Sequence, residues 1–205
     1  WSITEEKMLV APYLGVHDDL VENEGYVIPY GDSPLDTDKV GENVYIDILN
    51  HAREYVYIMT PYLILDSELE HAIQFAAERG VDVRIIMPGI PDKPIPYALA
   101  KTYYQALTKS GVKIYEYTPG FVHSKIFLSD NTKAVVGTIN LDYRSLYHHF
   151  ECAVYLYKVD AIQDIYRDYM DTLNKSRLVS LKDINNIPKF QKVIGIVTKT
   201  IAPLL

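Results

Sequence analysis

Three apolar runs separated by helix-like segments constrain the fold of this 205-residue chain more than any other feature. The runs cover residues 55–60, 81–87 and 112–117 and are rich in Val, Ile, Tyr and Met. Between the first two, a helix capped by Asp66 or Ser67 is stopped by Gly80. Between the second and third, a proline-rich loop leads into a helix over 98–110. Repeats of strand, helix and strand predict a parallel sheet covered by helices.

The segments on either side of this unit are predicted to add strands to the sheet, and the strands after it are expected to be antiparallel rather than parallel. A short strand over 25–29 and a helix from Glu42 to Ala52 come before it. After residue 117, three strand-like runs follow one another with short polar connections, so we expect them to pair antiparallel. They are Ser124 to Leu128, Ala134 to Thr138 and Glu151 to Tyr157. Helical patterns over 159–173 and 187–201 are both expected to pack on the sheet. The predicted fold is therefore α/β, a mixed β-sheet flanked by helices on both faces.

Composition sets the size of the domain and the kind of partner. With 48% hydrophobic residues, the chain is long enough for one large core, so we expect one domain over 25–205 after a lead-in or linker over 1–24. The start at Trp1 leads us to expect a piece of a longer protein.

A net charge of −7 disfavours nucleic acid as a partner, because nucleic-acid binding depends on Lys and Arg. No apolar stretch is long enough to span a membrane, so by itself the chain is expected to be soluble and of cytoplasmic type. The lone Cys152 excludes an intrachain disulfide and is expected to be buried.

The candidate catalytic residues lie in the antiparallel part. His123-Ser124-Lys125 is followed by Asp130 and then by Gly137-Thr138-Ile139-Asn140, and the chain holds this set once. An imidazole can attack phosphorus and form a covalent phosphohistidine. Donors from Lys125 and Asn140 would hold the oxygens on which charge gathers in the transition state. Thr138 offers a hydroxyl to the bound group. This chemistry needs no metal and no cofactor.

Three further residues are expected to support that site. Glu151 opens an apolar strand, so if buried it needs a partner, and a hydrogen bond to His123 would fix the tautomer of the imidazole. Asp130 lies an odd number of positions from His123 and Lys125, so a continuous strand would put it on the other face. We therefore expect Asp130 to be structural and to anchor the turn near Asn131. Gly137, without a side chain, lets backbone and Asn140 come close to the ligand.

The spacing H-x-K-x4-D-x6-G-[ST]-x-N resembles the signature of the phospholipase D superfamily. The flanking sequence is similar to the C-terminal half of bacterial cardiolipin synthases, through 26–34, 55–66, 80–92, 111–150 and the closing Pro203-Leu204-Leu205. The resemblance implies an α-β-α sandwich in which two motif-bearing halves face each other. One histidine attacks the phosphate of phosphatidylglycerol, the other acts as acid and base, and a second phosphatidylglycerol accepts the phosphatidyl group, giving cardiolipin and glycerol. The catalytic residues implied here are His123, Lys125, Asn140 and Glu151.

The resemblance also implies what this chain lacks. Such synthases carry N-terminal membrane helices, so the full-length protein is expected in the cell membrane. They also carry a first motif, but none of the other histidines here has a Lys two residues on: His17, His51, His71, His148 and His149. The second half is therefore expected either in the same full-length chain or in a homodimer.

Two other function classes stay open. A self-pairing single-motif phosphodiesterase or nuclease is disfavoured by the acidic net charge, and a catalytically silent binding domain is disfavoured by the intact motif.

Adjacent His148 and His149 point apart on a strand and do not favour a metal site. Tyr30 and Tyr62 lie beside turns and are read as packing residues rather than as cleft lining. The stretch from Lys182 to Lys199 is either an amphipathic helix on anionic lipid or a core helix.

Overall fold

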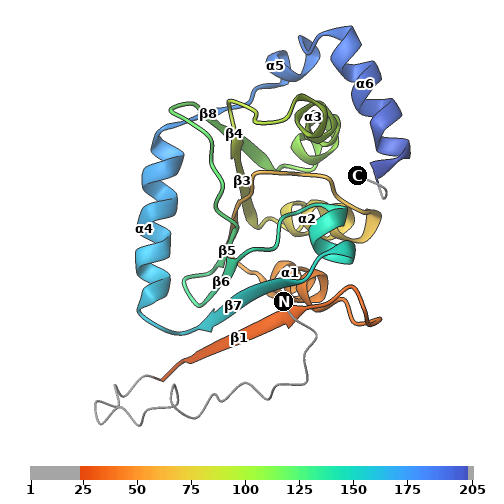
Figure 1. The fold of residues 1–205 in the computed structure, drawn as a ribbon. Helices are drawn as coiled ribbons and strands as arrows, with labels where there is room; N and C mark the ends of the chain where they lie inside the picture. The colour runs from red at the N-terminus through yellow and green to blue at the C-terminus, as the bar shows by residue number, and fades with distance from the viewer. Residues whose placement is uncertain (1–23, 203–205) are drawn as a thin grey trace.

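The computed structural model describes residues 24–202 and contains one mixed sheet of eight strands (Figure 1). The strand order is β1-β7-β6-β5-β2-β3-β4-β8. Strands β2, β3 and β4 run parallel, and every other neighbouring pair is antiparallel. In chain order the elements are β1 (Tyr26–Asp32), α1 (Val40–His51), β2 (Tyr55–Met59), α2 (Ser67–Glu78), β3 (Asp82–Pro88), α3 (Pro94–Lys109), β4 (Lys113–Tyr117), β5 (Ile126–Ser129), β6 (Lys133–Gly137), the single π-helical turn η2 (Arg144–His148), β7 (Glu151–Tyr157), α4 (Ala161–Asn174), β8 (Ser176–Leu178), α5 (Leu181–Asn185) and α6 (Lys189–Thr200).

The parallel part forms as the sequence predicts. All five residues of β2 are buried, as expected for a strand covered on both faces. The Asp66 carboxylate accepts from the backbone N–H of Leu69 at 2.7 Å and caps α2. Beyond the end of α2, Gly80 adopts a φ of 94°, a conformation that glycine takes without strain. The strand–helix–strand reading of residues 55–117 is therefore confirmed.

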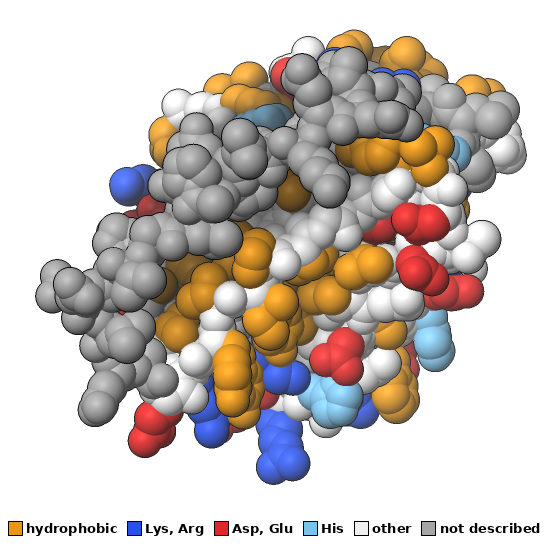
Figure 2. All heavy atoms as spheres, turned by 60° about the horizontal axis from the view of Figure 1, so that its bottom comes forward, with side chains coloured by type: hydrophobic (Ala, Val, Ile, Leu, Met, Phe, Trp, Pro, Cys, Tyr) orange, Lys and Arg blue, Asp and Glu red, His pale blue; other side chains and the backbone are white. Residues whose placement is uncertain are grey.

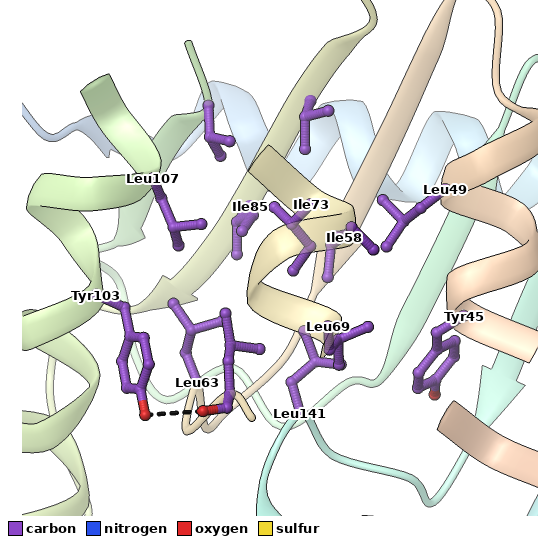
Figure 3. Packing of buried hydrophobic residues seen from close by; sticks show 14 of the residues in the cluster. Tyr45, Leu49, Ile58, Leu63, Leu69, Ile73, Ile85, Tyr103, Leu107 and Leu141 are labelled. Carbon is purple, nitrogen blue, oxygen red and sulfur yellow. Dashed lines mark hydrogen bonds between the residues drawn. The ribbon is translucent and has the colours of Figure 1, made fainter. Parts of the chain in front are cut away.

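The two faces of the sheet carry different layers. Helices α1, α2 and α3 cover one face, and α4 covers the other (Figure 1). The first core is mainly aliphatic, with Leu69, Ile73 and Ile85 fully buried, and its Tyr103 hydroxyl donates to the Leu65 carbonyl at 2.9 Å (Figure 3). Under α4 the core is rich in tyrosine, including Tyr57 and Tyr169. The predicted fold class is confirmed.

Several boundaries differ from the sequence prediction. Helix α3 begins at Pro94 rather than near Ala98, because proline needs no N–H partner in a first helical turn. Strand β5 begins only at Ile126, so His123 and Lys125 come before the ladder instead of within it. The short elements η2, β8 and α5 were not predicted. Cys152 is exposed rather than buried.

The two C-terminal helices also differ from expectation. Helix α4 packs on the sheet as predicted, through Ile162, Tyr169 and Leu173. Helix α6 does not reach the sheet; it lies on the outside of α3 (Figure 1). The expected lead-in and the closing Pro203-Leu204-Leu205 lie outside the described residues, apart from Glu24.

The edge of the sheet formed by β1 exposes apolar side chains. Figure 2 looks onto this side and shows hydrophobic side chains gathered together, with charged side chains around them. On β1 itself, Tyr26, Val27 and Ile28 are each at least half exposed. Within residues 24–202, no helix has both the length and the apolar character needed to cross a membrane.

Candidate active site

The predicted motif residues other than Asp130 lie at one end of three neighbouring strands. His123 and Lys125 directly precede β5, Gly137 ends β6, and Glu151 begins β7. These strands are adjacent in the order β7-β6-β5, so the three strand ends meet at the same edge. The backbone N–H of Gly137 donates to the Lys125 carbonyl at 3.4 Å, and that of Thr138 to the Cys152 carbonyl at 2.9 Å. The antiparallel pairing thus joins segments that are far apart in the sequence.

His123 and Lys125 contact each other directly. The Lys125 ammonium donates to the His123 backbone carbonyl at 2.6 Å and lies 3.1 Å and 3.2 Å from Nδ1 and Nε2 of the ring. His123 is exposed, whereas Lys125 is 8% exposed. Burial lowers the pKa of Lys125, and the charges of Glu151 and Asp142 oppose that shift. An accessible imidazole therefore lies beside a buried amine.

Glu151 has a different partner from the one expected. The Thr138 hydroxyl donates to one carboxylate oxygen of Glu151, and Nδ1 of His149 lies 3.9 Å from the other. Among the described residues, Glu151 forms no hydrogen bond to His123, so that expectation is wrong here. The reason is topological, because Thr138 at the end of β6 directly faces the start of β7. The negative charge of Glu151 still affects the site, because it opposes the lowering of the Lys125 pKa by burial.

Asp130 is structural, but it anchors a different segment. Its carboxylate accepts from the backbone N–H groups of Arg53, Glu54 and Tyr55 at 2.8, 3.0 and 2.9 Å. It therefore fixes the start of β2 rather than the turn at Asn131. The argument from strand alternation does not apply, since β5 ends at Ser129. Both Asp130 and Asn131 have a φ of 51°, which makes this turn tight.

Gly137 is required by packing against β7. A Cβ atom at this position would lie 2.4 Å from the Cys152 carbonyl oxygen and 2.5 Å from Cα of Ala153. Any side chain would push β6 and β7 apart at the point where Thr138 meets Glu151. This differs from the expected role, in which the missing side chain makes room for a ligand. Gly137 serves the site by allowing the strands to come together.

Asn140 has one donor in use and one acceptor without a partner. Its Nδ2 donates to the Ser145 hydroxyl at 3.1 Å, while Oδ1 is buried without a hydrogen bond. Turning the amide over would let the Ser145 hydroxyl donate to Oδ1 and would direct the NH₂ group to the unpartnered side. In that orientation the contact with Ser145 is kept, and the buried position without a partner holds an N–H donor instead of a carbonyl oxygen.

Buried residues hold the segment that carries Asn140. The Tyr45 hydroxyl donates to the Ile139 carbonyl at 3.1 Å, and the Tyr45 ring stacks on Phe127 with centroids 4.0 Å apart. On the other side, the Leu141 carbonyl accepts from Ile64 N–H at 2.7 Å. The sequence reading missed Tyr45, although its place on the apolar side of a predicted helix marked it as a core residue.

The π-helical turn after Asn140 is fixed by a pair of buried carboxyl groups. The Tyr147 hydroxyl lies within hydrogen-bonding distance of both carboxyl groups, 3.0 Å from that of Glu42, and donates its single proton to one of them at a time. Burial and the neighbouring Asp66 raise the pKa of Glu42 to about 7. Burial acts against ionisation of Asp66 as well, but hydrogen bonds from Glu42, Tyr147 and Leu69 bring its pKa below the usual value. Through these two carboxyl groups, Tyr147 ties η2 to α1 and to the N-terminus of α2.

A hollow of about 250 Å³ lies next to Asp142, two residues beyond Asn140. Its walls are mostly apolar, with two cationic residues among them, and it is lined by Tyr62, Ile64, Ile95, Pro96, Lys93 and Arg144. On its other side Tyr62 also borders a narrow space shared with Phe121, whose ring centroid is 5.9 Å from that of His123. The hydroxyl of Tyr62 donates to Asp92 at 2.5 Å. An apolar surface with cations therefore adjoins the motif.

Among the described residues, no group of three or more His, Cys, Asp or Glu side chains is arranged to hold a metal ion. The donors that the site does offer are an imidazole, an ammonium, a carboxamide and a hydroxyl. These groups suit nucleophilic attack and the binding of anionic oxygens.

Comparison with known proteins points in the same direction. The family described as "Cardiolipin synthase, PLD-like domain" matches residues 45–173. An uncharacterized protein of Streptococcus mutans is 64% identical over 205 residues, all of this chain and 44% of the relative. The cardiolipin synthase of Alkalihalophilus pseudofirmus is 33% identical over 202 residues, which make up 98% of this chain and 40% of the relative. The chain thus spans less than half the length of these curated relatives.

Solved structures share the fold. The phosphatidylserine synthase of Haemophilus influenzae matches with a TM-score of 0.69 and 18% identity, over 90% of this chain and 49% of that one. Nuc of Salmonella typhimurium, described as a phospholipase D family member, matches with a TM-score of 0.64 and 18% identity. The match covers 76% of this chain and 99% of Nuc. At this identity the likeness concerns the fold.

Proposed function

Because the chain belongs to the family of cardiolipin synthase PLD-like domains, we propose that residues 25–205 are one catalytic half of a phosphatidyltransferase that makes cardiolipin and glycerol from two phosphatidylglycerols. The observation that carries the proposal is the pairing of the exposed His123 with the buried Lys125 at the edge where β5, β6 and β7 meet. The anionic phospholipid substrates and a membrane location of the full-length protein follow from the same proposal.

In the first step, a ring nitrogen of His123 attacks phosphorus. A P–N bond forms, the P–O bond to the glycerol headgroup breaks, and an acid gives its proton to the departing oxygen. In the second step, a hydroxyl of another phosphatidylglycerol attacks the phosphohistidine, loses its proton to the same group, and the P–N bond breaks. The histidine of a second half, in the same full-length chain or in a second copy, would be that acid and base.

The other motif residues bind and position. Lys125 and the amide of Asn140 would hold the phosphoryl oxygens, each worth roughly 3–4 kcal/mol in the transition state. Thr138 and Glu151 form a pair at the rim of the site and keep a negative charge near Lys125. The hollow beside Asp142, with Lys93 and Arg144, suits the glycerol backbone and a second anionic headgroup. Asp130 and Gly137 stabilise the fold around the site: Asp130 fixes the start of β2, and Gly137 allows β6 and β7 to pack closely.

The test measures conversion of labelled phosphatidylglycerol by the chain alone and by the chain mixed with a complementing motif-bearing half. We expect cardiolipin and glycerol only from the mixture, and a covalent acid-labile phosphoprotein after rapid quenching. His123→Ala should remove both, with unchanged circular dichroism. His71→Ala, at an exposed position on α2 outside the motif, is the matched control and should leave both unchanged.

Equal turnover by wild type and His123→Ala would end the proposal. The second candidate, a self-pairing phosphodiesterase, draws on Nuc, whose whole length is close to the segment it matches here. Cleavage of DNA by the lone chain, without transfer between lipids, would favour that candidate. The net charge of −7 argues against it.

A further inference from the structure

Helix α6 has two different apolar sides, and only one of them is packed. The packed side meets α3 at Gly195, where a Cβ atom would lie 2.5 Å from Cγ2 of Thr102 and 2.7 Å from the Ala98 carbonyl oxygen. Thr198 on the same side is 7% exposed, and Ala202 just after the helix is 2% exposed. Small residues therefore seat α6 closely on α3.

The opposite side of α6 is a stripe of large apolar side chains in solvent. Phe190, Val193, Val197 and Ile201 recur at intervals of three or four residues, which places them along one side of the helix. They are 65%, 60%, 60% and 47% exposed. Ile194 and Ile196 flank the stripe and are exposed as well. We call Phe190, Val193, Val197 and Ile201 the α6 stripe.

The charge of this segment is opposite to that of the chain. Residues 184–205 contain three lysines, Lys189, Lys192 and Lys199, and no Asp or Glu. The whole chain has a net charge of −7. Lys199 is paired with Glu70 at 3.5 Å and lies over the Tyr103 ring of α3, so the net positive charge of the segment beyond that ion pair comes from Lys189 and Lys192. A segment that combines a stripe of Phe, Val and Ile with net positive charge has the composition of helices that lie flat at the surface of an anionic bilayer. Helix α6 has 12 residues, a length of about 18 Å, and therefore suits the interface rather than the roughly 30 Å of a membrane core.

The place of α6 in the fold separates it from the proposed active site. It covers α3, which connects β3 to β4, whereas the motif lies at β5, β6 and β7 in the other part of the sheet order. Figure 1 shows α6 at the periphery, beyond α3. A second catalytic half that reaches His123 is therefore not required to cover the α6 stripe.

We propose that the α6 stripe is a membrane-docking surface, which lays the α3–α6 side of the domain on bilayers rich in anionic phospholipid. Docking in this way would hold the domain beside lipid while its motif stays at a different edge. The inference stands apart from the proposed function, because binding to a bilayer needs neither His123 nor a second half.

The test is co-sedimentation of the 205-residue chain with vesicles. We expect binding to vesicles of phosphatidylglycerol and phosphatidylcholine, much weaker binding to phosphatidylcholine alone, and loss of binding as salt is raised. Val193→Ser together with Val197→Ser should weaken partitioning by roughly tenfold or more. The matched control is Val27→Ser with Ile28→Ser on β1, where Val27 is also 60% exposed, and it should bind like wild type. Thermal unfolding checks that each variant is folded.

Other outcomes decide against the proposal. If wild type ignores anionic vesicles, or if the α6 variant binds as well as wild type, the docking surface does not exist. A concentration-dependent dimer that the α6 variant abolishes would assign the stripe to a second copy of the chain. Vesicle binding is measured on the lone chain, from which the proposed function expects no cardiolipin, so a failure of the catalytic proposal is distinguishable from a failure of this one.

Discussion

Helices α4 and α6 begin from similar sequence patterns and end in opposite environments. Each is amphipathic, and each pattern predicted a helix packed on the sheet. Helix α4 buries Ile162, Tyr169 and Leu173 against the sheet. Helix α6 docks through Gly195 and leaves residues such as Val197 in solvent. The comparison teaches that helical periodicity identifies an apolar side but does not say what covers it.

Among changes in these two helices, truncation of Tyr169 in α4 should cause the largest loss in the free energy of unfolding. This side chain is fully buried, its ring stacks on Tyr57 at 5.1 Å, and its hydroxyl donates to the Arg84 carbonyl at 3.2 Å. Tyr169→Ala should lower the free energy of unfolding in urea by about 3–5 kcal/mol, because it opens a cavity under α4. Tyr169→Phe keeps the ring and should lower it by about 1 kcal/mol. A small effect of Tyr169→Ala would mean that α4 is loosely attached.

The second-largest effect is expected from alkaline pH, which should destabilise the packing of α4 on the sheet. Burial raises the pKa of Tyr57 to about 12 and that of Tyr55 to about 12. Both phenols are neutral in the native state at pH values where free tyrosine ionises. Their contribution is complete below about pH 10 and is lost as the pH rises through 12, by about 2 kcal/mol per phenol.

The measurement is the unfolding free energy against pH, followed with the absorbance of ionised phenol. Tyr57→Phe should show a shallower fall between pH 10 and 12 than wild type. An identical slope in the two proteins would contradict the buried position of Tyr57 beneath α4.

Gly195→Ala tests whether α6 is docked, through the sign of the effect. In a free helix this change is stabilising by about 1 kcal/mol. In the docked helix the new Cβ overlaps the Ala98 carbonyl, so we expect a net loss of about 1–2 kcal/mol in thermal unfolding. Thr200→Ala, at an exposed position of the same helix, should be neutral or stabilising. A gain in stability at Gly195 would show that α6 is not seated on α3.

The smallest effect is expected in the α6 stripe. Val197→Ala should change the unfolding free energy by no more than about 0.5 kcal/mol, since the side chain is 60% exposed. The check is chemical unfolding at two protein concentrations. A loss above 1 kcal/mol that grows with concentration would mean that the stripe is already covered by another copy.

Many residues of the candidate site could be predicted from the sequence alone. His123, Lys125, Thr138 and Asn140 are candidates because of their spacing and chemistry, and the three antiparallel strands next to which they lie are visible in the sequence as short apolar runs. Their contacts were not readable, because a partner is chosen across strands. Glu151 meets Thr138 rather than His123, and Asp130 anchors the start of β2 instead of its own turn.

The missed elements have a common cause. Strand β8 is three residues long and forms by pairing with β4, where Arg177 meets Glu116 at 2.9 Å. Helix α5 depends on a capping box at Ser180 and Asp183, and η2 on the contact of Tyr147 with Glu42 and Asp66. Such short pieces have too few residues for a periodic signal, so distant contacts decide them.

The sequence by itself determined the α/β class, the parallel and antiparallel parts of the sheet, and the residues with the chemistry to attack a phosphodiester. These follow from local periodicity and residue type, which act over a few neighbouring positions. Only the tertiary structure decided which strand ends meet, which carboxylate faces which hydroxyl, and that α6 turns its large apolar side away from the protein. Those choices depend on packing between distant segments, as where α6 approaches α3 so closely that a Cβ at position 195 would overlap the Ala98 carbonyl.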